Sequence, residues 1–362
     1  MSIRPSLRRF PHSFHNVTKT PNVGIVSAPF NKGQPKMGVE LGPKIIKEHG
    51  LIKNLKSLGY KKVTEYPEIQ FEIIENEEPD GNVNYPLSTG RANEQIYRGV
   101  YQSLKEGNKT LVLGGDHSIA IGSIFAHSKF IADHKDKFWS NLGPGEDNFC
   151  CLWVDAHADI NTSNTSYSGN LHGQCLSYLL KSDIIENYVR LVRGFEWMGQ
   201  RKSLRPERLA YIGLRDIDLK ESKLLHELGI TYCSMHDVDK HGIDHCFERC
   251  IDKINPSGAR STHVSFDIDA LDPDYAPSTG TPVQGGLTLR DAQFIGERLN
   301  RLGVEVNVMD LVEVNPRLVG DFLEVDGDRT AKHANYVIES FFGRDRGGTF
   351  KDGVALPLKD EY

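Results

Sequence analysis

The most constraining feature of this sequence is an alternation of short apolar or β-branched runs with amphipathic stretches, sustained from Asn22 almost to the end of the chain. Eight runs are strand candidates, at residues 22–28, 61–66, 110–115, 149–156, 208–214, 230–234, 262–269 and 304–314. Helical patterns lie between most of them. Because strands joined by helices pair in parallel and need cover on both faces, the pattern predicts an α/β fold with a mainly parallel sheet.

No linker rich in proline, glycine or serine divides the sequence. We therefore expect an N-terminal arm at residues 1–21, a single domain at residues 22–343 and a polar tail at residues 344–362. One connection is longer than a crossover between parallel strands needs, and we interpret residues 132–147 within it as a surface insertion. The tail is either loose or docked on a neighbouring subunit.

The composition excludes some classes of partner. The 362 residues are 38% hydrophobic and 25% charged, with a formal net charge of −6, so no broad positive field attracts nucleic acid or anionic lipid. No apolar stretch approaches the roughly 18–20 residues that span a bilayer. Six cysteines without CxxC spacing favour buried, reduced thiols. We therefore expect a cytoplasmic protein that binds neither nucleic acid nor membrane.

The N-terminal arm keeps a mitochondrial location open as the alternative. Its apolar residues are spaced as on one helical face, arginines lie between them, and no acidic residue precedes Glu40. These features are typical of a transit peptide. Pro5 and Pro11 disfavour a helix there, however, and favour a frayed cytoplasmic arm.

Metal-ligand residue types follow several of the predicted strands. Asp155, His157 and Asp159 alternate at the end of one run, so their side chains leave an extended chain on the same side. Because ligands of parallel α/β sheets bind beyond the carboxyl ends of the strands, we expect residues at these ends to converge on one rim. The converging set is His117, Asp155, His157, Asp159, Asp216, Asp218, Asp267, Asp269 and Glu313.

Taken singly, these residues have structural explanations, such as a helix-start histidine at His117 or an N-cap at Asp267. A calcium loop starting at Asp267 fails, because Leu271 occupies its fifth position and no acid closes it. Together, four carboxylates about 5 Å apart would repel by roughly 3 kcal/mol per pair at an effective dielectric constant near 20. Two divalent cations would neutralise them; the oxygen and imidazole donors favour Mn²⁺ and leave Co²⁺, Fe²⁺ and Zn²⁺ open.

Several motifs closely resemble those of the arginases, within the ureohydrolase family. They are GIVSAPFNKGQPKMGVELGP (24–43), GGDHS (114–118), DAHADINT (155–162), SGNLHGQ (168–174), SFDIDALDPDYAPSTGTPVQGG (265–286) and EVNP (313–316). The resemblance covers about residues 22–343. It implies a three-layer αβα sandwich of the arginase/deacetylase type and two Mn²⁺ per chain. The implied reaction cleaves the guanidinium of L-arginine to L-ornithine and urea, using a metal-bridging hydroxide.

The resemblance also implies roles for individual residues. The implied metal ligands are His117, Asp155, His157, Asp159, Asp267 and Asp269. Among the implied catalytic residues, His172 shuttles protons, Glu313 faces the guanidinium, and Asp159 takes the proton from the attacking hydroxide. Two structural alternatives remain, because Glu313 could pair with an arginine and His172 could be a hydrogen-bonded residue at a helix start.

Within the enzyme class, the alternatives are agmatinase and other amidinohydrolases. Agmatine lacks the α-carboxylate of arginine, so an arginase needs donors for that group and an acid for the α-ammonium. The candidate substrate-binding residues are Asn161, Ser166, Ser168, Asp216, Asp218, Thr281 and Glu313. These arginase-type positions favour arginine as substrate. A non-catalytic metal-binding sensor is the alternative from another class, but such a chain is expected to lose ligands, and none is lost here.

Two departures from the arginase pattern lie near the site: Cys175 stands where arginases commonly have proline, and Ser166 replaces a usual threonine while keeping the hydroxyl. The resemblance further implies a homotrimer. We expect Arg346 in the tail to contact Glu297 and Arg290 of a neighbouring subunit, since these two residues are seven apart and share one helix face.

Overall fold

The computed structural model describes residues 22–72, 74–134, 148–186, 192–199, 203–318 and 324–347. The predicted arm at residues 1–21 lies outside the described residues, as do residues 135–147 of the predicted insertion and residues 348–362 of the predicted tail. Residues 132 and 133, at the start of the predicted insertion, are the last two residues of the helix Ala120–Asp133.

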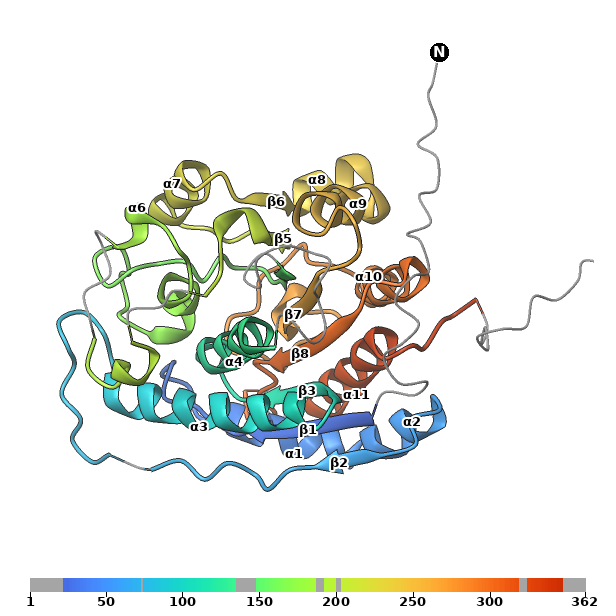
Figure 1. Ribbon diagram of the computed structural model, residues 1–362, viewed down its shortest axis with the longest axis horizontal. Coiled ribbons are helices and arrows are strands. Elements are labelled where there is room, and N and C mark those ends of the chain that lie inside the picture. Colours follow the sequence, from blue (N-terminus) through green and yellow to red (C-terminus); the bar gives the residue numbers. More distant parts are fainter. Residues whose placement is uncertain are drawn as a thin grey trace, which may run out of the picture.

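An eight-stranded sheet forms the centre of the molecule (Figure 1). Its strands are β1 (Asn22–Ala28), β2 (Val63–Glu65), β3 (Asn108–Gly114), β4 (Phe149–Val154), β5 (Leu209–Leu214), β6 (Thr231–Ser234), β7 (Ser261–Asp267) and β8 (Val306–Val312). Their order is β2-β1-β3-β8-β7-β4-β5-β6, and every neighbouring pair is parallel. The predicted fold class is confirmed.

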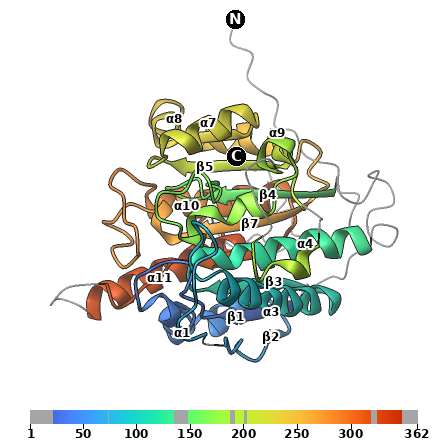
Figure 2. The same cartoon turned by 90° about the vertical axis from the view of Figure 1, so that its left-hand side faces the viewer.

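Helices cover both faces of the sheet, which gives three layers. They are α1 (Gly42–Glu48), α2 (Leu51–Ser57), α3 (Pro86–Lys105), α4 (Ala120–Asp133), α6 (Asp183–Glu186), α7 (Leu219–Glu227), α8 (Met235–His241), α9 (Ile243–Ile254), α10 (Leu289–Leu302) and α11 (Glu324–Phe341). In Figure 2, α10 and α11 lie on one side of the strands, and α3 and α4 lie on the other. Within the described ranges, no helix combines the length and apolar character needed to cross a membrane.

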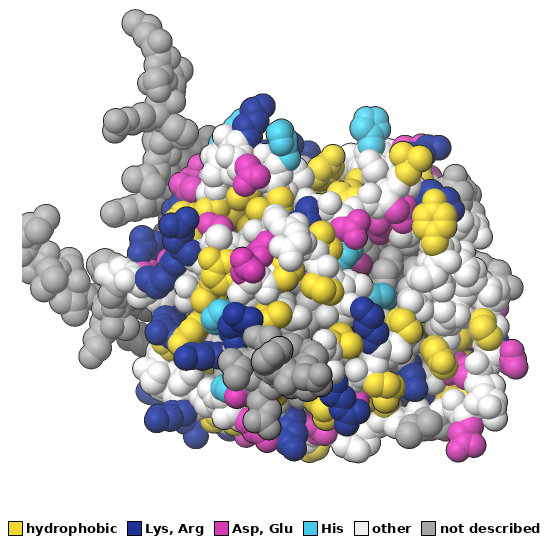
Figure 3. All heavy atoms as spheres, turned by 180° about the vertical axis from the view of Figure 1, so that it is seen from behind, with side chains coloured by type: hydrophobic (Ala, Val, Ile, Leu, Met, Phe, Trp, Pro, Cys, Tyr) yellow, Lys and Arg dark blue, Asp and Glu magenta, His cyan; other side chains and the backbone are white. Residues whose placement is uncertain are grey.

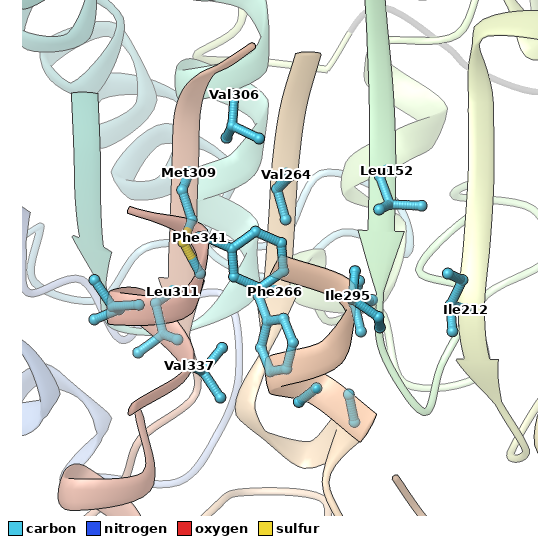
Figure 4. Packing of buried hydrophobic residues seen from close by; sticks show 14 of the residues in the cluster. Leu152, Ile212, Val264, Phe266, Ile295, Val306, Met309, Leu311, Val337 and Phe341 are labelled. Atoms are coloured by element: carbon cyan, nitrogen blue, oxygen red, sulfur yellow. The ribbon is translucent and has the colours of Figure 1, made fainter. Parts of the chain in front are cut away.

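The strands are buried on both sides because their alternate residues enter different apolar cores. In β4, Leu152 joins the core beneath α9, α10 and α11, whereas Trp153 joins the core beneath α4. Figure 4 shows Leu152, Val264 and Phe266 in the first core, together with Phe341 of α11. Burial of such side chains stabilises the fold by roughly 1.5–3 kcal/mol each. The packing therefore fixes the strand ends, which carry the candidate site.

Several helices begin at side-chain caps that the sequence encodes locally. Asp218 accepts hydrogen bonds from the first turn of α7, and the Glu221 side chain accepts one from the backbone of Asp218. Ser234 and Thr288 form equivalent capping boxes at α8 and α10. Such reciprocal caps satisfy backbone N–H groups that a helix start leaves unpaired. Asp218 thus has a structural role besides its predicted contact with substrate.

Candidate metal centre

Four adjacent strands deliver the candidate ligands to one edge of the sheet. His117 begins the short 3₁₀ helix that follows β3, Asp155 follows β4, and Asp267 is the last residue of β7. Glu313 directly follows β8, which lies between β3 and β7. Because the strands are parallel, these ends meet at the same edge. The expected convergence at the carboxyl ends is what the fold produces.

The first group of side chains surrounds His117. Its Nδ1 atom lies 3.1 Å from Asp155 Oδ2, 3.2 Å from Asp159 Oδ2 and 3.1 Å from Asp267 Oδ2. All four side chains are buried. A neutral imidazole nitrogen and three carboxylate oxygens that converge in this way form a donor set suited to a divalent cation.

The second group surrounds His157 and is more open. The Nδ1 atom of His157 lies 3.5 Å from Asp155 Oδ1 and 3.2 Å from Asp269 Oδ2, and its side chain is 21% exposed. Ligand atoms of His117, Asp155 and Asp267 lie within 4.8 Å of one another, as do those of Asp155, His157 and Asp269. Asp155 belongs to both groups, so the donors fit two neighbouring ions that share one carboxylate.

The electrostatics of this cluster favours the binding of cations. Burial raises the pKa of Asp267 well above its usual value, and the Asp269 and Asp155 carboxylates raise it further. Burial and Asp155 likewise raise the pKa of Asp159. Burial alone would lower the pKa of His117, but hydrogen bonds with the carboxylates outweigh it and raise the value. Unpaired buried charges are costly, so bound cations would relieve a repulsion that protons otherwise have to relieve.

Side chains outside the ligand sets hold the ligands in place. Trp153 stacks on the His117 ring at a centroid distance of 4.1 Å, and its Nε1 donates to Asp155 Oδ2 at 2.8 Å. The His117 Nε2 atom lies 2.9 Å from Ser265 Oγ. Sequence reasoning missed both residues, although each stands two positions before a predicted ligand and therefore shares its strand face.

The two predicted proton-handling and guanidinium-facing residues lie beside the first group. The Nδ1 atom of His172 lies 3.3 Å from Glu313 Oε1, and the same oxygen accepts a hydrogen bond from the His117 backbone N–H at 2.9 Å. Burial lowers the pKa of His172, but Glu313 reverses this effect and raises it to about 8. A histidine with this pKa exchanges protons near neutral pH.

Asp159 and Glu313 both have backbone conformations that are unusual for their residue type. Their φ angles are +49° and +64°, in the left-handed region that favours glycine. Non-glycine residues held there cost on the order of 1–3 kcal/mol each and are concentrated at functional sites. The surrounding packing imposes this conformation at two of the residues predicted to act in catalysis.

The predicted substrate-binding residues of the outer rim, Asn161, Ser166, Ser168 and Asp218, make local hydrogen bonds. The Nδ2 atom of Asn161 donates to Asp218 Oδ2 at 2.9 Å, Ser166 Oγ accepts from the Gly169 N–H at 3.0 Å, and Ser168 Oγ accepts from the Asn170 N–H at 3.2 Å. Rim side chains therefore satisfy part of their hydrogen-bonding capacity locally, and substrate would have to compete for it.

Asp216 and Thr281 each contact a candidate ligand. The Oδ2 atom of Asp216 is 3.6 Å from His157 Nε2, with the Asp216 side chain 67% exposed. Thr281 Oγ1 donates to Asp269 Oδ2 at 2.9 Å. Both are thus in a position to orient a candidate ligand.

Two further buried acids at the site were not predicted. Glu221 Oε1 accepts from the Ile160 N–H at 3.3 Å, and burial with the Asp159 and Asp218 carboxylates raises its pKa to about 8. Burial and Glu313 raise the pKa of Asp116 to about 7. The Asp-x-x-Glu spacing of the α7 capping box was the signal that would have found Glu221.

Arg346 contacts Glu297 and Arg290 within its own chain. Its Nε atom lies 2.7 Å from Glu297 Oε1, and its guanidinium donates to the Arg290 carbonyl oxygen at 3.2 Å. The contact with these residues of a neighbouring subunit stays a prediction. After α11 the chain turns back onto α10, whose Arg290 and Glu297 lie two turns apart on one face.

The fold and ligand geometry together define an α/β protein with a candidate two-metal centre at the carboxyl edge of its sheet. The family model described as "Arginase family" matches residues 21–343. The chain belongs to the arginase family, whose members are hydrolases with a binuclear metal centre. The prediction of an enzyme of this family is confirmed.

Known proteins support the same conclusion. The chain is 41% identical to "Arginase-2, mitochondrial" of Mus musculus, over 90% of this chain and 86% of that protein. It is 41% identical to "Arginase-1" of Homo sapiens, over 92% of this chain and 96% of that protein. Among solved structures, the arginase from Bacillus caldovelox superposes with a TM-score of 0.75 at 31% identity, covering 90% of this chain and all of the other.

Proposed function

We propose that this enzyme is an arginase that hydrolyses the guanidinium of L-arginine to L-ornithine and urea, with two Mn²⁺ per chain. The observation that carries the proposal is the pair of ligand groups that share Asp155, with Glu313 and His172 beside them. Oxygen and imidazole donors without thiolate support Mn²⁺. When bound, the ions would supply a nucleophile by lowering the pKa of water.

The proposed ligands are His117, Asp155, Asp159 and Asp267 in the first group, with His157 and Asp269 completing the second. Asp155 supplies one carboxylate oxygen to each group. Two bound dications would balance the four aspartate carboxylates, so Glu313, which lies outside both groups, is the carboxylate that attracts a guanidinium.

The residues beside the ligands have complementary roles in the proposed reaction. Glu313 orients the substrate guanidinium, which stays charged at every relevant pH and prefers a carboxylate partner. Asp159 accepts the proton that the attacking water loses. His172, with its pKa near 8, protonates the departing amine, because an amine leaves more readily once it is protonated.

The outer rim supports arginine as the substrate in preference to agmatine. Asn161, Ser166 and Ser168 supply neutral donors for an α-carboxylate, and Asp218 supplies an acid for the α-ammonium. The Oδ1 atom of Asn161 is buried without a hydrogen-bond partner among the described residues. This oxygen can accept a hydrogen bond from the α-ammonium or from water, whereas the Asn161 Nδ2 group is the donor that would reach the α-carboxylate.

The test is urea release by the purified protein with Mn²⁺, with L-arginine and agmatine as separate substrates. We expect hydrolysis of arginine and a much lower kcat/KM for agmatine. Glu313→Gln should abolish urea release while both ions are retained; Glu339→Gln, on the buried side of α11, is the matched control and should remain active. Equal efficiency with agmatine would refute the substrate, and full activity of metal-free protein would refute the metal centre.

Two further proposals concern the setting of the enzyme. We propose a cytoplasmic location, which six free, buried cysteines support because buried thiols persist in reducing compartments. We also propose the homotrimer that the family resemblance implies. Sedimentation of the unaltered protein tests this homotrimer.

The charges on the surface bear on nucleic acid as a partner. Figure 3 shows basic, acidic and hydrophobic side chains interspersed on one face of the molecule, so that face has no large patch of a single sign of charge for nucleic acid.

A further inference from the structure

A stripe of buried polar side chains runs along one face of β7, in the core of the sheet. Ser261, His263, Ser265 and Asp267 alternate with apolar or neutral neighbours, so all four face the side that α4 covers. Each is 3% exposed or less. Buried polar groups destabilise a core unless they are hydrogen-bonded, so their partners must account for them.

Asp310 of β8 is the hub of this stripe. It lies opposite Ser265 in the β7–β8 register and is fully buried. Its Oδ2 atom is 2.8 Å from His263 Nε2, accepts from Ser123 Oγ of α4 at 2.6 Å, and accepts from Ser265 Oγ at 3.4 Å. The Oδ1 atom has no hydrogen-bond partner within the described part of the chain. The side chains of His263, Ser123 and Ser265 therefore all donate to one oxygen of Asp310. Among the described contacts, no arginine or lysine pairs with this carboxylate.

The hub connects to the candidate metal centre through a single hydroxyl. Ser265 has one proton, which it gives to Asp310, so its oxygen can only accept from His117 Nε2 at 2.9 Å. That leaves the proton of a neutral His117 on Nε2 and a lone pair on Nδ1. Nδ1 is the atom that faces Asp155 and Asp267.

The surroundings of Nδ1 favour the opposite arrangement when no cation is present. Three carboxylate oxygens within 3.2 Å attract a proton to Nδ1, and an imidazole with a proton there cannot bind a metal. If Ser265 turned its proton toward His117 Nε2, this non-binding form would gain a hydrogen bond. An acceptor on the far side of Ser265 prevents that reversal.

We propose that Asp310 is a positioning residue which, through Ser265, keeps the His117 proton on Nε2 and leaves Nδ1 free for the ion of the first group. This inference rests on the two-ion centre of the proposed function. Asp310 touches neither ion nor substrate, and it acts only by fixing the direction of the Asp310–Ser265–His117 hydrogen bonds. Partners that orient a metal-binding histidine typically change metal affinity about 10- to 100-fold.

The experiment measures Mn²⁺ binding to the full chain by electron paramagnetic resonance, without substrate. Unaltered protein should bind two ions. In Asp310→Asn, an amide either accepts more weakly or turns its NH₂ group toward Ser265, so one ion should bind about 10- to 100-fold more weakly while the other is unaffected. The spectrum at limiting Mn²⁺ should then be that of a single, uncoupled ion.

A double-variant comparison separates positioning from a purely structural role. If Asp310 acts through Ser265, Asp310→Asn should add nothing to the loss of affinity that Ser265→Ala causes. Ser103→Ala is the matched control, because it removes the buried contact of Ser103 Oγ with Thr110 Oγ1, at 2.8 Å, which has no hydrogen-bonded connection to a candidate ligand. It should leave both affinities unchanged.

Unchanged affinity for both ions in Asp310→Asn, or fully additive losses in the double variant, would overturn the proposal. Should Asp310→Asn fail to fold, His263→Leu removes the 2.8 Å contact that fixes the carboxylate, and unchanged affinity there overturns the proposal equally. Unaltered protein that binds two ions but releases no urea would refute the proposed substrate and leave this inference standing.

Discussion

The inner ligand groups and the outer rim are built in different ways. His117, Asp155 and Asp267 stand at the ends of central strands and are buried. Trp153 contacts His117 and Asp155, and Ser265 contacts His117, which fixes the orientation of these two residues. Rim side chains stand on loops and pair with one another, as Asn161 does with Asp218. The inner groups are therefore organised before any ligand arrives, whereas the rim has to exchange internal hydrogen bonds for contacts with substrate.

This difference separates two kinds of failure. A change among the ligands removes a charge that neighbouring charges depend on, so its effect should reach both ions. A change on the rim removes one hydrogen bond to a charged group, which contributes about 1.5–3 kcal/mol. If the two regions act independently, changes among the ligands should weaken the binding of both ions, and changes on the rim should weaken only the binding of substrate.

The largest effect is expected at Asp155, because its two oxygens serve both ligand groups. Asp155→Asn should eliminate binding of both Mn²⁺ ions and reduce urea release to background. Metal content after gel filtration, together with far-ultraviolet circular dichroism of the apo protein, checks the result. Retention of one tightly bound ion would mean that the groups are separate sites.

His172→Asn should lower kcat by about 10²- to 10⁴-fold, the range for loss of a general acid or base. Both ions should remain bound, because His172 contacts Glu313 rather than the inner carboxylates. Steady-state kinetics with parallel metal analysis distinguishes a loss of proton transfer from a loss of bound metal. An unchanged kcat would assign proton transfer to another group.

On the rim, Asp218→Asn should raise the KM for arginine about 10- to 100-fold with little change in kcat or metal content. Asp218 also caps α7, so Thr288→Ala, which removes the equivalent cap of α10, is the matched control. Asparagine caps a helix about as well as aspartate, so the control should lose more stability than Asp218→Asn and still keep its KM. Equal rises in KM would attribute the effect to helix capping.

The pH dependence of stability tests the contact between His172 and Glu313, which lies beside the first ligand group. The folded pKa of His172, about 8, exceeds the ordinary 6.5, so protonated His172 stabilises the fold. That contribution is fully present below about pH 6.5, is lost as pH rises through 8, and amounts to about 2 kcal/mol. Urea unfolding of metal-free protein at pH 6 and pH 9 should show a larger difference for the unaltered chain than for His172→Asn. An identical difference would show that Glu313 does not hold the charged form.

The smallest effect is expected away from both regions, at Arg346. Arg346→Ala should lower the free energy of unfolding by about 0.2–1 kcal/mol, because it removes a contact with Glu297 near the surface. Its sedimentation coefficient should match that of the unaltered protein, since the contact is within one chain. Dissociation of an assembly on this change would restore a role for Arg346 between subunits.

The sequence predicted the strands and the convergence of the candidate ligands, because both follow from local patterns. The alternation of Asp155, His157 and Asp159 places their side chains on one side of the chain. Parallel pairing then brings the carboxyl ends of the neighbouring strands to the same edge of the sheet. Contacts that depend on register between strands were missed, such as Asp310 opposite Ser265. Rim contacts were also beyond reach, because loop conformations such as those that bring Asn161 to Asp218 are set by the packed fold rather than by local spacing.

The left-handed backbone at Asp159 and Glu313 places activity and heat resistance in opposition. A chain selected only for thermal stability would gain by relaxing these two positions, and the simplest way is to replace their side chains with residues that tolerate the conformation. Each such replacement discards a carboxylate that the proposed reaction uses. Directed evolution of this enzyme for thermal stability should therefore be screened for catalysis in every round, because stabilising replacements of Asp159 or Glu313 would abolish activity.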